Sequence, residues 1–383
     1  MISEFQVRTK LIYGFNSLDQ LGAEINKLGA QKVFLVTDTV ISSIGLLNLV
    51  GDRLKEAGLQ YIVFDGVEPD PVLENIIEAK QKFDESGCDT ILAVGGGSCM
   101  DAAKAVAILV TNEGELVQFE GADKIPNPPR PVIAIPTTAG TGSEVTGSCV
   151  VIDRERKAKM SIRSAYLQPV LAFLDPRLLA TVPPSVAAAT GMDTLTHAIE
   201  AYVSTGSALV TDSLALSAIE LTARNLPAFV ANNKNLEAAY NMQVACTMAA
   251  MAFQWARVAT VHAMAHSLGG YHRIPHGVAN AVLLPRVMEF SLIGNLEKFK
   301  NIAVAMGYDV EGLTPYEAAY QSVVAVTNLS KCIGIPGGMN ELGVTEDTLE
   351  PMSVDAERSG ICAKNPRITS VKDMVNIFRA SMY

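Results

Sequence analysis

The sequence lacks several features that would assign it to other classes of protein. None of its apolar runs reaches the roughly 18–20 residues that a membrane-spanning helix needs, and the first residues, MISEFQVRTK, do not resemble a signal peptide. Basic residues are also outnumbered, 30 against 40 acidic ones, which gives a net charge of −10. This balance argues against a nucleic-acid-binding protein and against binding to an anionic membrane surface.

Cysteine is scarce and scattered, with no CxxC pair. In a chain of this size such cysteines are typical of reduced thiols in a cytoplasmic protein. The six are Cys88, Cys99, Cys149, Cys246, Cys332 and Cys362. A metal site built from thiolates is therefore not expected, and any metal would be held by nitrogen and oxygen atoms.

The length of 383 residues favours two domains. In the first half, predicted strands alternate with helical sequence; the strands are 32–38, 61–67, 90–98 and 131–138. This alternation predicts an α/β domain with a parallel sheet and Rossmann-like dinucleotide binding. From about Pro183 the sequence is rich in Ala and Met and helically periodic. We expect a dinucleotide-binding α/β domain over 1–180 and an all-helical, metal-binding and catalytic domain over 181–383.

Three glycines, Gly95–Gly97, lie at the end of the predicted strand segment 90–98 and precede helical sequence in AVGGGSCMDAAK. Backbone N–H groups and the positive end of a helix can there approach a phosphate without obstruction. The full dinucleotide fingerprint is not present, because Met100 stands where its third glycine would fall. The motif alone fits a tight strand-to-helix turn equally well.

A second loop, IPTTAGTGSEVT at 135–146, favours the phosphate interpretation. It follows another strand and carries hydroxyls, those of Thr137, Thr138, Thr141 and Ser143. Asp38, which closes the first strand, is a natural acceptor for the ribose hydroxyls of an adenosine and would repel a 2′-phosphate, so NAD is favoured over NADP. The alternative role for Asp38 is that of a helix cap.

Histidine is the rarest informative residue, with five in the chain. His262, His266, His272 and His276 fall within 261–277, and the fifth is His197. Asp193 and His197 are four residues apart on a predicted helix, so both project from one face, and His262 and His266 repeat the spacing. One carboxylate with several imidazoles suits Zn²⁺ or Fe²⁺. Spacing does not decide which four candidates bind the metal.

Long motifs give the whole chain a resemblance to a known family. GGGSxxDAAK, IPTTAGTGSEVT, GMDTLTHAIEAYVS, HAMAHSLGGYHRIPHG and NPRITS stand in the order and spacing of the iron-dependent (group III) alcohol dehydrogenase family, especially of its lactaldehyde reductase and 1,3-propanediol dehydrogenase branch. The resemblance implies a dehydroquinate synthase-like fold, with NAD bound in the cleft and one Fe²⁺, for which Zn²⁺ or Mn²⁺ could substitute. It also implies a homodimer, or a higher oligomer, through the N-terminal strands in FQVRTKLIYGF (5–15).

The resemblance also implies roles for individual residues. The metal ligands would be Asp193, His197, His262 and His276, and His266 or His272 would relay a proton as catalytic residues. The cofactor would be bound by Asp38, Asp70, Gly95, Gly96, Gly97, Ser98, Asp101, Thr137, Thr138, Thr141, Ser143, Lys159 and Leu178. The metal would act as a Lewis acid on the substrate oxygen while the nicotinamide exchanges hydride at the adjacent carbon.

The chain departs from the family pattern before His262, where Trp255 and Arg257 replace smaller residues. We hypothesise a small substrate with a polar or anionic end, such as a sulfonated or carboxylated aldehyde, that pairs with Arg257; a salt bridge between helices or protomers is the alternative. If 253–266 were one helix, Trp255 would share a face with His262 and Arg257 would not. Asp70 stands where asparagine is usual in the family, and NAD remains preferred. Positions that line the substrate pocket in relatives are Ser148, Phe253 and Cys362.

The leading function is that of an NAD-dependent, metal-dependent alcohol dehydrogenase or aldehyde reductase. An unspecialised short-chain primary alcohol or diol dehydrogenase is the alternative within the same class. A dehydroquinate synthase-like lyase is less favoured, because few basic residues for a phosphorylated substrate lie near the histidines. A non-catalytic nucleotide or metal sensor is disfavoured by the intact set of predicted ligands.

Overall fold

The structure is a computed structural model that describes residues 3–156 and 158–383. Within these residues the chain forms two compact units. The α/β unit comprises Gln6–Thr138 and Gly142–Leu179, and the helical unit comprises residues 3–5, Ala139–Thr141 and Ala180–Tyr383. The short segment Ala139–Thr141 thus belongs to the helical unit, although it lies within the loop at 135–146.

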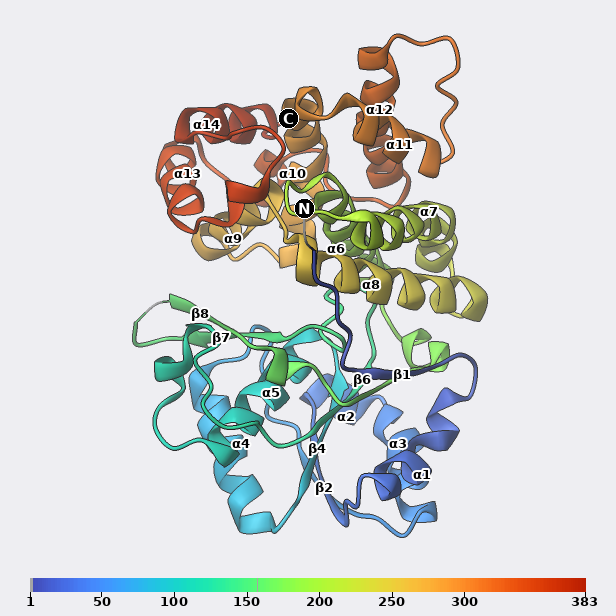
Figure 1. Ribbon diagram of the computed structural model, residues 1–383, viewed down its shortest axis with the longest axis vertical. Helices are drawn as coiled ribbons and strands as arrows, with labels where there is room; N and C mark the ends of the chain where they lie inside the picture. The colour runs from blue at the N-terminus through green and yellow to red at the C-terminus, as the bar shows by residue number, and fades with distance from the viewer. Residues whose placement is uncertain (1–2, 157) are drawn as a thin grey trace. The chain divides into compact units, whose positions relative to one another are not determined.

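A six-stranded parallel sheet forms the centre of the α/β unit, with strand order β1-β9-β6-β4-β2-β3 (Figure 1). β4 and β6 are buried along their whole length, as expected of parallel strands that are covered on both faces. The strands are β1 (Lys10–Tyr13), β2 (Lys32–Val36), β3 (Gln60–Phe64), β4 (Thr90–Gly95), β6 (Val132–Pro136) and β9 (Leu171–Leu174).

Helices alternate with these strands and supply the rest of the apolar core. Phe34, Phe64 and Phe83 pack together, with ring centroids 5.5–6.4 Å from that of Phe34. The helices of the α/β unit are α1 (Leu21–Lys27), α2 (Thr39–Ser43), α3 (Leu46–Glu56), α4 (Leu73–Ser86) and α5 (Gly97–Thr111). The predicted alternation of strands and helices is confirmed.

A second, three-stranded sheet was not predicted from the sequence. β7 (Ser148–Asp153) and β8 (Ala158–Arg163) form an antiparallel pair, and β5 (Gly121–Ala122) adds to β8. β8 alternates buried and exposed residues, with Met160 and Ile162 buried. This alternation is the usual pattern of a sheet with one face on the core. The alternation is present in the sequence of β8, although no strand was predicted there.

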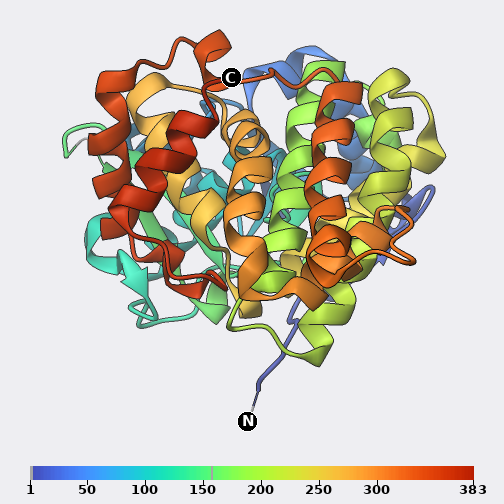
Figure 2. The ribbon, with the colours of Figure 1, turned by 90° about the horizontal axis from the view of Figure 1, so that it is seen from above.

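The helical unit is built from long, apolar helices that pack side by side (Figure 2). α6 is buried at every residue from Gly191 to Val203 and contacts α7, α8 and α10. The helices are α6 (Pro184–Val203), α7 (Leu209–Ala231), α8 (Leu236–Ala256), α9 (Thr260–His272), α10 (His276–Ser291), α11 (Leu296–Ala305), α12 (Pro315–Cys332), α13 (Leu349–Arg358) and α14 (Val371–Ala380). The predicted fold class, an α/β part with a parallel sheet followed by a helical part, is confirmed.

The stretch 253–266 is not one helix. α8 ends at Ala256 and α9 begins at Thr260, and the two helices are bent by 103°. Arg257 adopts a left-handed φ of 72°, which a right-handed helix cannot continue. Trp255 and His262 therefore do not share a face of one continuous helix.

One helical segment of the described residues has the length and apolarity of a membrane span. It runs from His276 to Gly294, and 56% of it is buried inside the structure. The segment is not an uninterrupted apolar run, because a few polar residues lie within it. A helix that is mostly buried in a protein core meets the same criteria, so this segment is weak evidence for a membrane protein.

Candidate functional site

Three of the four predicted metal ligands lie together in the helical unit. Asp193 comes from α6, His262 from α9 and His276 from the first turn of α10, and one ligand atom of each lies within 4.8 Å of the others. Asp193 Oδ1 is 3.9 Å from Nε2 of His262 and 3.7 Å from Nε2 of His276. Asp193 and His262 are buried, whereas His276 is one-third exposed. The group is thus reachable from one side.

His197, the fourth predicted ligand, borders this group. It lies one helical turn after Asp193, with Nδ1 3.9 Å from Asp193 Oδ1 and 3.2 Å from the carbonyl oxygen of Gly140. Its ring stacks on that of His262, with centroids 4.5 Å apart. A proton on Nδ1 would be donated to Gly140 and would leave Nε2 as the nitrogen with a free lone pair. The segment around Gly140 is also held by Thr194, whose hydroxyl donates to the Ala139 carbonyl.

The electrostatics of the group fit a cation. Burial raises the pKa of Asp193 and lowers the pKa of His262 well below its ordinary value. A neutral His262 presents a lone pair, so a carboxylate oxygen and two imidazole nitrogens converge. Such mutually facing acceptors are favourable only when a positive charge or a proton lies among them. One carboxylate with several imidazoles is a donor set for Fe²⁺ or Zn²⁺, so the residues fit the predicted metal.

Asn280, which the sequence analysis missed, supplies a donor to the group. Its amide nitrogen is 2.7 Å from Asp193 Oδ1, 3.1 Å from His276 Nε2 and 3.4 Å from His262 Nε2. The side chain is fully buried, and its Oδ1 has no hydrogen-bond partner. The spacing was available as a signal, because Asn280 follows His276 by four residues and therefore lies on the same helical face.

Glu200 was also missed. Its carboxylate is buried on α6 and accepts a hydrogen bond from Nδ1 of His262 at 2.6 Å. Burial raises the pKa of Glu200 to about 7, against the lowering effect of hydrogen bonds from the backbone of Ala259 and Val261. Its signal in the sequence is its position two helical turns after Asp193, on the same face of α6.

The two histidines predicted to relay a proton lie in different surroundings. His266 is exposed, and its ring centroid is 5.1 Å from that of His276 and 6.2 Å from that of His262. His272, at the end of α9, has Nε2 2.9 Å from the Thr348 hydroxyl. The structure therefore brings His266 beside the predicted ligands and places His272 against another segment.

The glycine-rich turn of the α/β unit requires its glycines. Gly95 has φ of 152°, and a Cβ there would overlap the Cys99 side chain. Gly96 precedes α5 directly, and a Cβ there would lie 3.3 Å from the Thr138 hydroxyl. Gly95 is buried, and Gly96, Gly97 and Ser98, which lead into the start of α5, are partly exposed. This geometry suits the approach of a phosphate.

Lys104 anchors the second loop from inside the unit. It is fully buried on α5, and its ammonium group donates to the carbonyl oxygens of Ser143, Thr146 and Ser148 and to the Ser143 hydroxyl, at 2.7–2.9 Å. Burial lowers the pKa of Lys104, and a nearby carboxylate, Asp101, opposes this shift. These bonds fix the backbone of the loop.

Asp101 and Ser143, both predicted to bind the cofactor, face the same internal network. Ser143 donates its hydroxyl to Asp101 Oδ1 at 2.9 Å, and the Val150 N–H donates to Asp101 Oδ2 at 3.0 Å. Ser143 is 4% exposed. Their side chains therefore shape the loop. Of the predicted threonines, Thr137 is buried, and Thr138 and Thr141 are partly exposed.

Asp38 takes the alternative role considered for it. It caps α2, because its Oδ1 accepts from the Ile41 N–H at 2.8 Å. Its second oxygen lies 3.3 Å from Cys99 Sγ, which donates to it. The carboxylate is only partly buried, so a cap and a contact with a ribose are compatible.

Asp70 and Lys159 form an exposed ion pair next to the glycine-rich turn. Their charged atoms are 3.3 Å apart, and the Asp70 N–H donates to the Ser98 hydroxyl at 3.2 Å. Asp70 has a left-handed φ of 54°. Of the other predicted cofactor residues, Thr141 belongs to the helical unit and Leu178 is fully buried.

The predicted substrate residues also differ in their surroundings. Phe253 stacks on His197, with ring centroids 4.3 Å apart, and Trp255 packs against Phe5 at 6.4 Å. Arg257 is exposed just beyond the end of α8. Cys362 is partly buried, and burial raises the pKa of its thiol, which favours an inert thiol. Ser148 lies in the α/β unit, at the start of β7.

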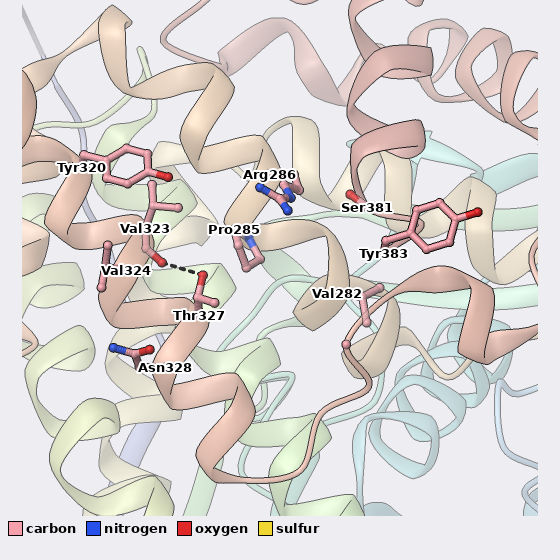
Figure 3. Close-up of a pocket in the computed structure, with 11 residues that line it drawn as sticks. Val282, Pro285, Arg286, Tyr320, Val323, Val324, Thr327, Asn328, Ser381 and Tyr383 are labelled. Carbon is pink, nitrogen blue, oxygen red and sulfur yellow. Dashed lines mark hydrogen bonds between the residues drawn. The ribbon is translucent and has the colours of Figure 1, made fainter.

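The helical unit also contains a cavity of about 260 Å³ (Figure 3). α10 and α12 line it together with the C-terminal residues Ser381 and Tyr383. None of the predicted site residues is among those that line it. Valine and tyrosine side chains make up much of its wall, and Arg286 is the one charged side chain among the lining residues.

The fold and the site together define a dinucleotide- and metal-dependent oxidoreductase, and comparison with known proteins gives the family. Residues 8–176 match the iron-containing alcohol dehydrogenase family, and residues 187–382 match the C-terminal part of the Fe-containing alcohol dehydrogenase family. The chain therefore belongs to the iron-containing alcohol dehydrogenase family, and the predicted enzyme class is confirmed.

Several relatives resemble the chain over nearly its whole length. It is 44% identical to a 1,3-propanediol dehydrogenase of Klebsiella pneumoniae, covering 96% of this chain and 95% of the relative. It is 36% identical to an NAD-dependent methanol dehydrogenase of Bacillus methanolicus, covering all of both chains. It is 37% identical to a lactaldehyde reductase of Escherichia coli (strain K12), covering 96% of this chain and 97% of the relative.

Solved structures agree with these relatives. A 1,3-propanediol oxidoreductase superposes with a TM-score of 0.98 at 42% identity, and both chains are fully covered. A sulfoacetaldehyde reductase from Bifidobacterium kashiwanohense, solved in complex with NAD⁺, superposes with a TM-score of 0.91 at 27% identity, covering 100% and 99% of the chains. Iron and NAD, the predicted cofactors, are confirmed at the level of the family.

Proposed function

We propose that this protein interconverts a small alcohol and its aldehyde with NAD, at a divalent metal ion held by Asp193, His197, His262 and His276. The observation that carries the proposal is the convergence of Asp193, His262 and His276, three lone-pair donors from three helices, within 4.8 Å. Their chemistry matches the iron of the family to which the chain belongs.

When bound, the ion would supply Lewis-acid activation of the substrate oxygen, and the nicotinamide would exchange hydride at the adjacent carbon. The protein's own groups hold and orient these partners. Gly95–Ser98 and Asp38 are proposed to bind the pyrophosphate and the adenine ribose. Phe253 stacks on His197 and is proposed to keep water from the His197 side of the cluster formed by Asp193, His262 and His276. His266, exposed beside His276, is placed to pass a proton between the substrate oxygen and solvent.

The proposed activity is tested with anaerobically prepared, iron-loaded protein and a panel of short aldehydes, with NADH absorbance as the readout. We expect steady oxidation of NADH with at least one aldehyde, and one bound metal ion per chain by elemental analysis. Metal-free protein should be inactive and should recover on addition of Fe²⁺. If the iron-loaded protein oxidised no NADH with any member of the panel, the proposal would be wrong.

For the substrate we propose a short aldehyde or alcohol with a polar or anionic end. Arg257 is exposed beyond the end of α8, four residues after Phe253, and a guanidinium pairs well with a carboxylate or sulfonate. One structural neighbour is named a sulfoacetaldehyde reductase. Arg257→Ala is expected to lower kcat/KM for acidic aldehydes about tenfold, which is about 1.4 kcal/mol, and to leave propionaldehyde unaffected. An equal loss on both classes would contradict this role.

An unspecialised diol or primary alcohol dehydrogenase is the second candidate, because relatives at higher identity are named for 1,3-propanediol and lactaldehyde. The same panel separates the two, since 1,3-propanediol and neutral aldehydes would then be preferred over acidic ones.

We also propose a cytoplasmic homodimer. The six cysteines are free, and the edge strand β1 and the residues after it expose Tyr13 and Phe15, which are 59% and 54% accessible. Light scattering of the purified protein tests the dimer.

A further inference from the structure

Glu200 links two of the helices that carry the predicted metal ligands. It lies on α6, two turns after Asp193, and its carboxylate reaches the start of α9, which carries His262. The side chain is 4% exposed, so its carboxylate is almost wholly surrounded by protein. Every hydrogen bond that we find at the carboxylate comes from α9 or from the residue before it.

The carboxylate replaces a missing helix cap. The first N–H groups of a helix have no partner within the helix, and a Ser, Thr, Asp or Asn at the N-cap normally accepts from one of them. The N-cap of α9 is Ala259, which has no side-chain acceptor. Glu200 takes over this role, because Oε2 accepts from the Ala259 N–H at 3.0 Å and Oε1 from the Val261 N–H at 2.6 Å. A negative charge at this end of the helix is also favoured by the helix dipole.

The same carboxylate sets the orientation of His262. Its Oε2 lies 2.6 Å from Nδ1 of His262, and as an acceptor it holds the proton on that nitrogen. The other ring nitrogen, Nε2, then carries the lone pair and faces Asp193 Oδ1 at 3.9 Å. A carboxylate behind a metal-binding histidine fixes the ring and makes it a stronger ligand.

We propose that Glu200 is a positioning residue of the metal centre, whose carboxylate joins the start of α9 to Nδ1 of His262 and so presents Nε2 to the metal. This inference rests on the proposed function, because it presupposes that His262 binds a metal ion. It adds to that function a residue outside the ligand set, and it explains why a carboxylate is buried on α6 without a lysine or arginine as partner among its described contacts.

The test compares metal binding by the wild-type protein, Glu200→Gln, Glu200→Asp and the control Ser204→Ala. In Glu200→Gln a single amide oxygen faces three N–H donors and can accept hydrogen bonds from only some of them. Ser204→Ala removes a hydrogen bond to the Ala256 carbonyl at the neighbouring α8–α9 turn without contacting a predicted ligand. Binding of Co²⁺ and Zn²⁺ to metal-free protein is measured by competition with a chromophoric chelator, and the visible spectrum of bound Co²⁺ reports the ligand field.

We expect Glu200→Gln to weaken metal binding about 10–100-fold and to change the Co²⁺ spectrum. Glu200→Asp, which keeps the charge on a shorter side chain, should show a smaller loss. Ser204→Ala should bind metal like the wild type, even if it unfolds at lower temperature. The inference is overturned if Glu200→Gln keeps wild-type affinity and spectrum, or if its loss is no greater than that of Ser204→Ala.

Two further outcomes keep the proposals distinguishable. If Glu200→Gln does not fold, Glu200→Asp decides, since affinity equal to that of Ser204→Ala overturns the positioning role and weaker binding supports it. If the wild-type protein itself binds neither ion, the proposed function fails and the inference falls with it. Metal binding by the wild type together with unchanged binding by both Glu200 variants removes the inference alone.

Discussion

Two sets of buried polar atoms differ in how they are paired. One is the cluster of predicted metal ligands on α6, α9 and α10, called the metal group below, and the other is the hydrogen-bond network around Lys104. In the metal group, Asp193, His262 and His276 turn acceptors toward one another, with one amide, that of Asn280, among them. In the network, the ammonium group of Lys104 is surrounded by four oxygens and so completes its own hydrogen bonds. The first arrangement is incomplete without a cation, and the second is complete within the protein.

The difference provides a criterion for recognising a ligand site among buried polar groups. The side chains of Asp101 and Ser143 look like cofactor contacts in the sequence, yet their polar atoms bond to each other and to the loop. The polar atoms of the metal group have fewer donors than acceptors, and the orphaned Asn280 oxygen shows the same mismatch. An imbalance of donors and acceptors indicates a ligand more reliably than the number of polar residues.

The largest expected effect comes from removing a predicted ligand. His276→Ala should abolish stoichiometric metal binding and lower kcat about a thousand-fold, since a bound metal contributes several kcal/mol to transition-state stabilisation. Elemental analysis and NADH oxidation measure both. His272→Ala is the matched control, because this histidine bonds to Thr348 instead. Equal losses in the two variants would break the distinction between the metal group and its neighbours.

The network should respond through stability. Lys104→Met leaves the buried oxygens of the loop without their donor, and we expect the free energy of unfolding to fall by about 3 kcal/mol or more. Urea unfolding measures this change. The KM for NADH should also rise, because the loop backbone is no longer fixed, whereas the metal content should stay that of the wild type. A loss of metal would contradict the separation of the two regions.

Asn280 allows a finer test of the metal group. Asn280→Ala removes the donor that bonds to Asp193, and we expect the metal-free protein to lose about 1 kcal/mol of stability. With the metal bound, the cation itself partners the carboxylate, so the loss should be smaller. Thermal unfolding with and without Zn²⁺ measures the difference. An equal loss in both states would mean that Asn280 has a purely structural role.

The smallest effect is expected at Glu24 of the α/β unit, whose buried carboxylate pairs with two exposed lysines, Lys10 and Lys27. Hydrogen bonds from Lys10 and Lys27 lower the pKa of Glu24 below 4.5, its ordinary value. Because the folded-state pKa is depressed, the contribution to stability is present above pH 4.5 and is lost as the pH falls through the folded-state pKa. Glu24→Gln should therefore destabilise the protein by less than about 1 kcal/mol at pH 7.

In acid this difference should disappear. Urea midpoints of the wild type and Glu24→Gln, measured at pH 7 and at decreasing pH until the carboxylate of Glu24 is protonated in the folded protein, provide the test. A difference that persisted unchanged in acid would show that the substitution acts through packing and not through the ion pair.

Local sequence patterns were sufficient for the main strands and helices. β2, β3, β4 and β6 begin within one residue of the predicted starts and end two or three residues before the predicted ends. They could be recognised because a strand in a covered parallel sheet is a short apolar run bounded by turns. The β7–β8 pair was not predicted, although its strands are close in the chain and β8 has an alternating pattern. The contact of β1 with β9 was not predicted either, since pairing across about 160 residues leaves no local pattern. The sequence left open whether 253–266 forms one helix, because Arg257 is an ordinary residue whose left-handed φ is imposed by its surroundings.

The sequence by itself determined the chemistry that this chain can offer: four histidines within 261–277, an aspartate one turn before the fifth, and glycines at Gly95–Gly97 that leave backbone free for a phosphate. Residue type and spacing along one helix fix these properties. Only the tertiary structure decided which side chains meet, because α6, α9 and α10 are brought together by packing of their apolar faces. Helical spacing could have placed Glu200 on the face of Asp193 and Asn280 on the face of His276, but only the structure shows that they contact His262 and Asp193.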